Sequence, residues 1–202
     1  MRPEDYANLH LHKFLSISST SEKAIHDARV ELRRYLVVAK ATYLLHSRAE
    51  AVLVARSILR KLGEVRDMDV LTCLDRDKRD YLARKVVSQF GKMAKYELPR
   101  MYGSRLLVAR RVKANALALE VEEDFHEVRK RIRESRFLLE SLGQYSPTLR
   151  DVSRELGNMR DLYLYSVKCL KAEKKVDWEK VDELRRKVLE EIKRKLSHAG
   201  FT

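Results

Sequence analysis

A segment near the N-terminus recurs one hundred residues later, and this repeat limits the possible folds more than any other feature. The segment His26-Asp-Ala-Arg-Val-Glu-Leu-Arg33 returns as His126-Glu-Val-Arg-Lys-Arg-Ile-Arg133, so a histidine and two arginines keep their spacing. On a helix, with about 100° between residues, these positions form one stripe, and apolar residues form a second stripe beside it. A basic stripe that borders the core stripe predicts a groove between packed helices rather than a solvated outer face.

A second motif, Leu-Gly-x-x-Arg-Asp, follows each copy of the first, at 62–67 and again in the second half of the chain. Its arginines, Arg66 and Arg160, fall within the apolar seam of their helices. An arginine there is costly unless it meets an opposite charge or opens onto a cavity. The glycines, Gly63 and Gly157, would let a crossing helix approach closely, at a helix-propensity cost of about 1 kcal/mol each. We infer that both arginines reach into the groove lined by the first motif.

Only three prolines and six glycines interrupt 202 residues, which predicts an all-α protein. Ser19-x-x-Glu22 reads as a capping box, Ser146-Pro147 as an N-cap followed by the first helical residue, and Asp177 as a further N-cap. Each half then holds a lead-in helix, one helix for each motif, and a tail helix, which predicts two four-helix bundles, 1–98 and 99–202, related by internal duplication. The expected helices span about 3–16, 21–47, 49–73, 76–97, a part of 100–119, 122–142, 147–172 and 177–197.

The charge of the chain points to a polyanionic partner. Lys and Arg total 43 against 30 Asp and Glu, a net charge of +13. Such an excess fits nucleic acid, an anionic membrane surface or an inorganic polyanion. No apolar run approaches eighteen residues, and the first residues lack an apolar signal core. We therefore expect no membrane span and a cytoplasmic location.

The histidines do not form a metal site in this pattern. Neither His26 nor His126 has a metal-ligating residue four positions on, and the arginines around them would repel a divalent cation. Cys73 and Cys169 stand alone, with no CxxC pair. The sequence shows no acidic cluster for Mg²⁺ and no glycine-rich phosphate loop. We expect no metal, no cofactor, no catalytic residue and no enzymatic activity.

Taken together, the four motifs resemble those of the conserved histidine α-helical domain, the CHAD family, over nearly the whole chain. Arg133 stands where the family commonly has lysine, Phe137 where it has tyrosine, and Arg160 where it often has asparagine. The matching residues, in the order of the four motifs, are His26, Arg29, Val30, Arg33 and Arg34; Leu62, Gly63, Arg66, Asp67, Asp69 and Val70; His126, Arg129, Arg133, Arg136, Phe137 and Glu140; and Leu156, Gly157 and Asp161.

The resemblance implies a single CHAD domain over 1–202, in its stand-alone form, whose two bundles lie about a pseudo-twofold axis. It also implies a basic channel between the bundles that binds inorganic polyphosphate, for storage, granule targeting or regulation. Family members occur at polyphosphate granules, and some are fused to triphosphate-tunnel metalloenzyme domains. Such an enzyme is therefore an expected partner, and sulfate or phosphate ions would occupy the same site.

The arginine fork makes bidentate contacts to phosphate oxygens, whereas lysine supplies a mobile point charge. We expect His26 and His126 to hydrogen-bond phosphate or orient neighbouring arginines, so affinity should rise as pH falls through about 6.5. Asp69 is expected to pair with Arg66. The expected ligands are, first, Arg29, Arg33, Arg66, Arg129, Arg133 and Arg160, with the two histidines, and second, Lys40, Lys130 and Arg136; Asp67, Asp69 and Asp161 support them.

Two other functions fit parts of the pattern. Net charge alone permits an RNA- or DNA-binding protein, although basic residues interleaved with exposed aromatics, which would favour single strands, are few. A phosphate-transferring enzyme working through His26 or His126 would need a base or a metal, and none is identifiable. A competition experiment between polyphosphate and nucleic acid tests the first alternative, and a measurement of phosphate release from polyphosphate tests the second.

Overall fold

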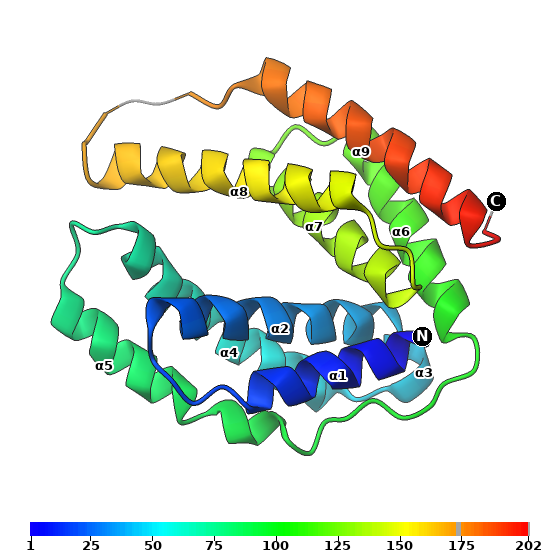
Figure 1. The fold of residues 1–202 in the computed structure, drawn as a ribbon, viewed down its shortest axis with the longest axis horizontal. Helices are drawn as coiled ribbons and strands as arrows, with labels where there is room; N and C mark the ends of the chain where they lie inside the picture. Colours follow the sequence, from blue (N-terminus) through cyan, green and yellow to red (C-terminus); the bar gives the residue numbers. More distant parts are fainter. Residues whose placement is uncertain (173–174, 202) are drawn as a thin grey trace. The chain divides into compact units, whose positions relative to one another are not determined.

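The computed structural model describes residues 1–172 and 175–201, and every regular element within these ranges is helical (Figure 1). The all-α prediction is confirmed. No helix among the described residues is both long and apolar enough to cross a bilayer. The elements are α1 (Pro3–Leu15), α2 (Glu22–Ala41), α3 (Tyr43–His46), α4 (Ala49–Val70), α5 (Arg76–Val87), the 3₁₀ helix η1 (Phe90–Met93), α6 (Ser104–Glu120), α7 (Phe125–Ser141), α8 (Pro147–Lys168) and α9 (Trp178–His198).

The chain forms two compact units. The first unit comprises residues 4–102, and the second comprises residues 103 onward together with residues 1–3. The first unit extends past residue 98, where we expected it to end, because α1 holds the segment that follows. Asn8 donates from Nδ2 to the Leu98 carbonyl at 2.9 Å and accepts from the Leu98 N–H at 2.8 Å. Glu4 accepts from the Met101 N–H at 3.1 Å.

Helix starts follow the capping residues, with one shift. Ser146 accepts from the Leu149 N–H at 3.2 Å with Pro147 as the first helical residue, and Asp177 accepts from the Lys180 N–H at 3.0 Å, both as predicted. At α2 the cap is Ser21 rather than Ser19, since Ser21 accepts from the Ala24 N–H at 3.3 Å. The prediction of a serine N-cap was right, but the capping serine lies two residues later than predicted.

Several helices end earlier than predicted. The helix expected over 21–47 ends at Ala41, where the Thr42 hydroxyl donates back to the Val38 carbonyl at 2.8 Å, and the short α3 follows. Hydroxyl back-bonding of this kind bends helices. The helix expected over 76–97 ends at Val87 and is followed by η1. In the same way α4 ends at Val70 and α8 at Lys168.

In the first unit α2 packs against α4, and α4 also packs against α5. The apolar stripe of α2, which includes Ile25, Ala28, Leu32 and Leu36, is buried, as is the facing stripe of α4. Burying a large aliphatic side chain contributes about 1.5–3 kcal/mol, so this contact is a main source of the unit's stability.

A buried histidine joins α1 to α2. We assigned no role to His10 from the sequence, yet its Nδ1 donates to the Glu31 carboxylate, and its ring lies 4.3 Å from that of Tyr6. Burial alone would raise the pKa of Glu31, but the hydrogen bond and charge of His10, with Arg34 and Lys13, lower it below its usual value. The pair therefore favours the ionised carboxylate.

In the second unit α6 packs against α7 and α9, and α7 packs against α8 and α9. Asn115 lies within α6 and is only 1% exposed. Among the described residues neither its amide nitrogen nor its amide oxygen has a hydrogen-bond partner. Buried polar groups without a partner destabilise the folded state.

We expect Asn115→Leu, a change of nearly equal shape, to raise the free energy of unfolding by about 1–2 kcal/mol, because it removes two desolvated polar atoms. Thermal or urea unfolding followed by circular dichroism measures this change. Ser135→Ala is the matched comparison, since the Ser135 hydroxyl is also buried without a partner among the described residues, and it should give a smaller gain. A destabilised Asn115→Leu would show that the amide contributes a needed interaction.

Candidate functional site

The basic stripe of α2 borders its buried stripe, as the spacing predicts. Arg29 and Arg33 are half-buried, His26 is exposed, and Ile25, Ala28 and Leu32, which alternate with them along the helix, are fully buried. The 3.6-residue period of the helix produces this division, because residues three and four apart share a face. The guanidinium groups therefore stand at the edge of the α2–α4 contact.

Gly63 of α4 provides room for one of these guanidinium groups. A Cβ atom added at Gly63 would lie 3.7 Å from Nη2 of Arg29, an ordinary van der Waals contact. The nearest described atom is thus the end of an α2 side chain and not helix backbone, so the close approach of a crossing helix expected at Gly63 is not seen. The same expectation for Gly157 of α8 is wrong, since an added Cβ there meets no described atom within 4 Å. The two glycines are therefore not equivalent in packing.

Arg66 of α4 acts on the histidine of α2. Partial burial lowers the pKa of His26, and the positive charge of Arg66 lowers it further; Arg29 and Arg33 act in the same direction, while Asp27 opposes them. A charge affects a pKa in this way only when it is close. The packing of α4 on α2 thus brings Arg66, which lies 40 residues from His26 in the sequence, to the basic stripe.

Of two further predicted residues, Asp67 adjoins this cluster and Lys40 lies apart from it. Asp67 is half-buried on α4, next to Arg66 in the sequence. Lys40 lies in the last turn of α2, fourteen residues after His26. At 1.5 Å per residue the two are about 21 Å apart along the helix axis. Lys40 and His26 therefore cannot contact the same phosphate group.

We expected Asp69 to pair with Arg66, but it pairs with Arg79 of α5 instead. Arg79 is 4% exposed; its Nε donates to Asp69 Oδ1 at 2.7 Å, and its Nη1 donates to the Thr20 carbonyl at 2.7 Å. Removing one partner of a buried pair costs about 3–5 kcal/mol. Asp69 therefore stabilises the junction of α4, α5 and the start of α2. Sequence reasoning missed Arg79 because the pairing depends on how two helices cross.

The pattern of α2 recurs on α7 in the second unit. Arg129 and Arg133 are half-buried, His126 is exposed, and Val128 and Ile132 between them are fully buried. Partial burial lowers the pKa of His126, followed by the charge of Arg129 and, more weakly, that of Lys130; Glu127 and Asp124 oppose them. The first motif therefore has the same local placement in both units.

Three of the cations predicted on α7 and α8 are paired with carboxylates. Lys130 Nζ lies 3.0 Å from Glu127, and Arg136 Nε donates to Glu140 at 2.8 Å while its guanidinium lies over the Phe137 ring. Arg160 Nη1 donates to Asp161 at 3.0 Å, the carboxylate–arginine pairing expected of that aspartate. An i, i+4 carboxylate such as Glu140 can be read from the sequence, so the neutralisation of Arg136 was foreseeable.

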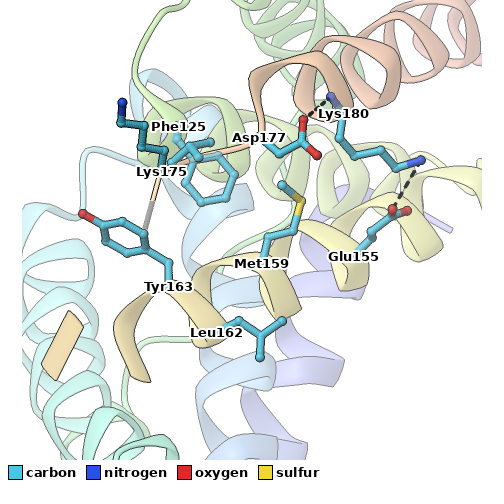
Figure 2. Close-up of a pocket in the computed structure, with 9 residues that line it drawn as sticks. Phe125, Glu155, Met159, Leu162, Tyr163, Lys175, Asp177 and Lys180 are labelled. Carbon is cyan, nitrogen blue, oxygen red and sulfur yellow. Dashed lines mark hydrogen bonds and ion pairs between the residues drawn. The ribbon is translucent and has the colours of Figure 1, made fainter. Parts of the chain in front are cut away.

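A pocket of about 270 Å³ lies in the second unit, lined by α8, the segment before α9 and the first residue of α7. In Figure 2, Phe125 and Met159 lie between Lys175 on one side and Lys180 on the other. Lys180 Nζ is 3.6 Å from Glu155. Because two lysines and two carboxylates line a mainly apolar pocket, it is not an anion site.

No metal centre is evident in the described part of the chain, where no group of three or more His, Cys, Asp and Glu could hold an ion. The arrangement on α2 and α4 instead offers guanidinium and imidazole donors on one edge. Such donors bind phosphate or carboxylate groups.

No family model, no curated protein and no solved structure matches the chain.

We expect Arg66→Gln to raise the pKa of His26, because it removes the charge that lowers this pKa most after burial. Arg160→Gln is the matched change in the second unit and should raise the pKa of His126 less, since the strongest charges on His126 come from α7 and the residue before it. NMR titration of the two imidazoles measures both shifts. Equal shifts in the two variants would contradict the proximity of Arg66 to His26.

Proposed function

We propose that this chain binds inorganic polyphosphate without catalysing a reaction, through the basic residues of α2 and α4 and the corresponding residues of α7 and α8. One observation carries the proposal: the charges of Arg66, Arg29 and Arg33 converge on His26. Clustering like charges is unfavourable, and an anion removes that cost when it binds. A cluster of this kind at the edge of a helix contact therefore favours an anionic ligand.

Polyphosphate suits this cluster better than a nucleic acid does. It carries about one charge per phosphate and offers no base, so recognition needs only closely spaced cations and hydrogen-bond donors. The arginine stripe provides such donors every three to four residues. Nucleic-acid recognition would add aromatic stacking or base-edge contacts, which the motif residues lack. The net charge of +13 favours binding of any polyanion and does not distinguish one polyanion from another.

We further propose that the chain is a member of the CHAD family, built by duplication of a four-helix unit. The support is the order of the four motifs and the similar placement of the first motif on α2 and α7. On this proposal the protein acts in polyphosphate storage, granule targeting or regulation in the cytoplasm, with a triphosphate-tunnel enzyme as its expected partner.

A long flexible polymer would engage both units, and each added contact converts a further binding step into an intramolecular one. Affinity should therefore increase with chain length and fall steeply with salt concentration. Lys130, Arg136 and Arg160 each pair with a carboxylate, so a ligand must compete with these carboxylates to bind them.

We expect Arg33→Glu together with Arg133→Glu to abolish binding of long-chain polyphosphate, measured by isothermal titration calorimetry at fixed salt. The reversal replaces two phosphate-binding donors by repelling carboxylates. Circular dichroism should show the same helicity as the unchanged chain, because both side chains lie at the margin of the core.

The matched control is Arg84→Glu with Arg186→Glu, two exposed arginines of α5 and α9. This variant has the same net charge as the test variant but keeps the motif residues, so it should bind nearly normally. If both double variants lost affinity equally, net charge rather than the motif would explain binding. An RNA oligomer that displaced polyphosphate at lower phosphate concentration would favour the nucleic-acid alternative, and phosphate release would favour the enzyme.

We expect affinity for polyphosphate to rise as pH falls, with the increase complete only below 6.5. The pKa of His26 and that of His126 are both lowered in the free protein, so the imidazoles are neutral at pH 7. A bound anion favours the imidazolium and raises both pKa values, which links binding to proton uptake. Titrations between pH 5.5 and 8 measure the trend, and His26→Gln with His126→Gln should flatten it. A profile unchanged by these substitutions would exclude the histidines from the site.

A further inference from the structure

Arg79 of α5 joins the end of α4 to the chain just before α2. Its Nε donates to Asp69 Oδ1 at 2.7 Å, and its Nη1 donates to the Thr20 carbonyl at 2.7 Å and to the exposed Asp80 carboxylate at 2.9 Å. Asp69 is the last residue but one of α4, and Thr20 lies two residues before α2 begins. One guanidinium group therefore fixes the distance between these two helix ends. We call its contacts with Asp69 and Thr20 the Arg79 bridge.

The gain in stability from the Arg79 bridge is small for the burial that it requires. Arg79 is 4% exposed and Asp69 is 6% exposed, so both groups lose most of their hydration. Among the described residues, Nη2 of Arg79 and Oδ2 of Asp69 are buried without a hydrogen-bond partner. Removing one partner of such a pair is costly, but apolar residues of similar volume often replace the whole pair without loss of stability. Net stability alone therefore does not explain the bridge.

The bridge and one further contact define how α2 and α4 lie against each other. At the start of α2, Thr20 is joined through the bridge to Asp69. Nine residues after Thr20, the Nη2 atom of Arg29 lies 3.7 Å from a Cβ atom added at Gly63. Gly63 precedes Asp69 by six residues, so the neighbours on α4 run backwards as α2 advances. The two helices are therefore antiparallel.

This register places Arg66 opposite His26. His26 lies three residues before Arg29 on α2, about 4.5 Å along the helix axis. Arg66 lies three residues after Gly63 on α4, which is the same distance in the same direction, because the helices are antiparallel. Asp69, the α4 end of the bridge, lies one helical turn beyond Arg66. The bridge therefore holds the two helices together one turn away from the two site residues.

The second unit has no carboxylate at the position of Asp69, where the corresponding residue is Tyr163. There, the charges that act most strongly on His126 come from α7 and the residue before it, and Arg160 is not among them. In the first unit, by contrast, Arg66 exerts the strongest charge effect on the histidine. The effect of the second-motif arginine is thus seen in the unit that has the bridge.

We propose that Arg79 is a positioning residue of the anion site, because its bridge holds α4 against the start of α2 and so keeps Arg66 beside His26. Arg79 is buried, so it acts through Arg66 and does not contact the ligand itself. The contribution to binding rests on the proposed polyphosphate function. The position of Arg66 does not, since it is measured without a ligand.

Replacing the whole pair by apolar residues separates position from stability. Arg79→Met with Asp69→Leu leaves the net charge unchanged, and the midpoint of thermal unfolding should stay equal or rise. Without the bridge Arg66 should move away from His26, so the pKa of His26 should rise toward its ordinary value in an NMR titration without ligand. The pKa of His126 in the same spectra should not change, because the bridge belongs to the first unit.

Isothermal titration calorimetry with long-chain polyphosphate at fixed salt measures the effect on binding. The apolar variant should bind about tenfold more weakly, close to the loss of one charge-assisted hydrogen bond. A change in net charge cannot cause this loss, because the variant removes one cation and one anion.

The matched control is Arg76→Gln with Glu22→Gln, which removes another ion pair between α5 and the start of α2. Arg76 Nη1 lies 2.9 Å from Glu22 Oε1, and the two side chains are 48% and 55% exposed. Exposed pairs of this kind contribute little. The control also keeps the net charge, so the pKa of His26 and the affinity for polyphosphate should both stay nearly unchanged.

Arg79→Lys provides a second test should the apolar variant fail to fold, which circular dichroism detects. It keeps the charge beside Asp69 but replaces the fork by a single ammonium group, which cannot hold both acceptors in the geometry of the fork. The pKa of His26 should therefore rise in this variant as well.

Three results would overturn the proposal. The first is a folded variant without the bridge in which the pKa of His26 is unchanged. The second is an equal shift of this pKa in the control, which would assign the effect to any contact between α5 and α2. The third is a raised pKa with undiminished affinity, which would remove the bridge from the binding site. Absence of polyphosphate binding by the unchanged chain would instead contradict the proposed function, and the pKa measurements would still decide the position of Arg66.

Discussion

The contact between the apolar stripe of α2 and that of α4 governs where the basic side chains of the first motif lie in the first unit. Ile25, Ala28 and Leu32 turn inward because they share a helix face, so the residues that alternate with them must stand at the rim of the contact. The same contact brings Arg66 to His26 across the helix pair. Packing of apolar residues thus determines an electrostatic feature, although none of the apolar residues carries charge.

The cations at this rim affect the protonation of His26 in the folded chain. Because the pKa of His26 is lowered in the folded state, the unfolded chain binds a proton there more readily, and protonation below about pH 6.5 disfavours folding. A bound anion would favour protonated His26 and so raise the pKa of His26 in the folded state. Ligand binding and stability are therefore coupled, so a bound polyanion should stabilise the folded state by mass action.

The sequence predicted that the chain is helical, where most helices start, and how α2 and α7 divide into basic and apolar stripes. These features depend on residues three or four apart. Helix ends were less predictable, as at Thr42, where a side-chain hydrogen bond replaces the continuing helix. Within the site, the proximity of Arg66 to His26 followed from the seam position of Arg66. The Asp69–Arg79 pair did not, since no local pattern shows which helix crosses which. The ligand itself remains a prediction.

The hydrogen bonds between α1 and the segment at 98–101 have a consequence for synthesis of the protein. Asn8 pairs with Leu98, and Glu4 with Met101, so the first helix is secured by backbone groups more than 85 residues downstream. Contacts of such sequence separation form late and slowly. While the chain emerges from the ribosome, α1 therefore lacks its partners at Leu98 and Met101 until residue 101 has left the exit tunnel, and the first unit completes its fold only then.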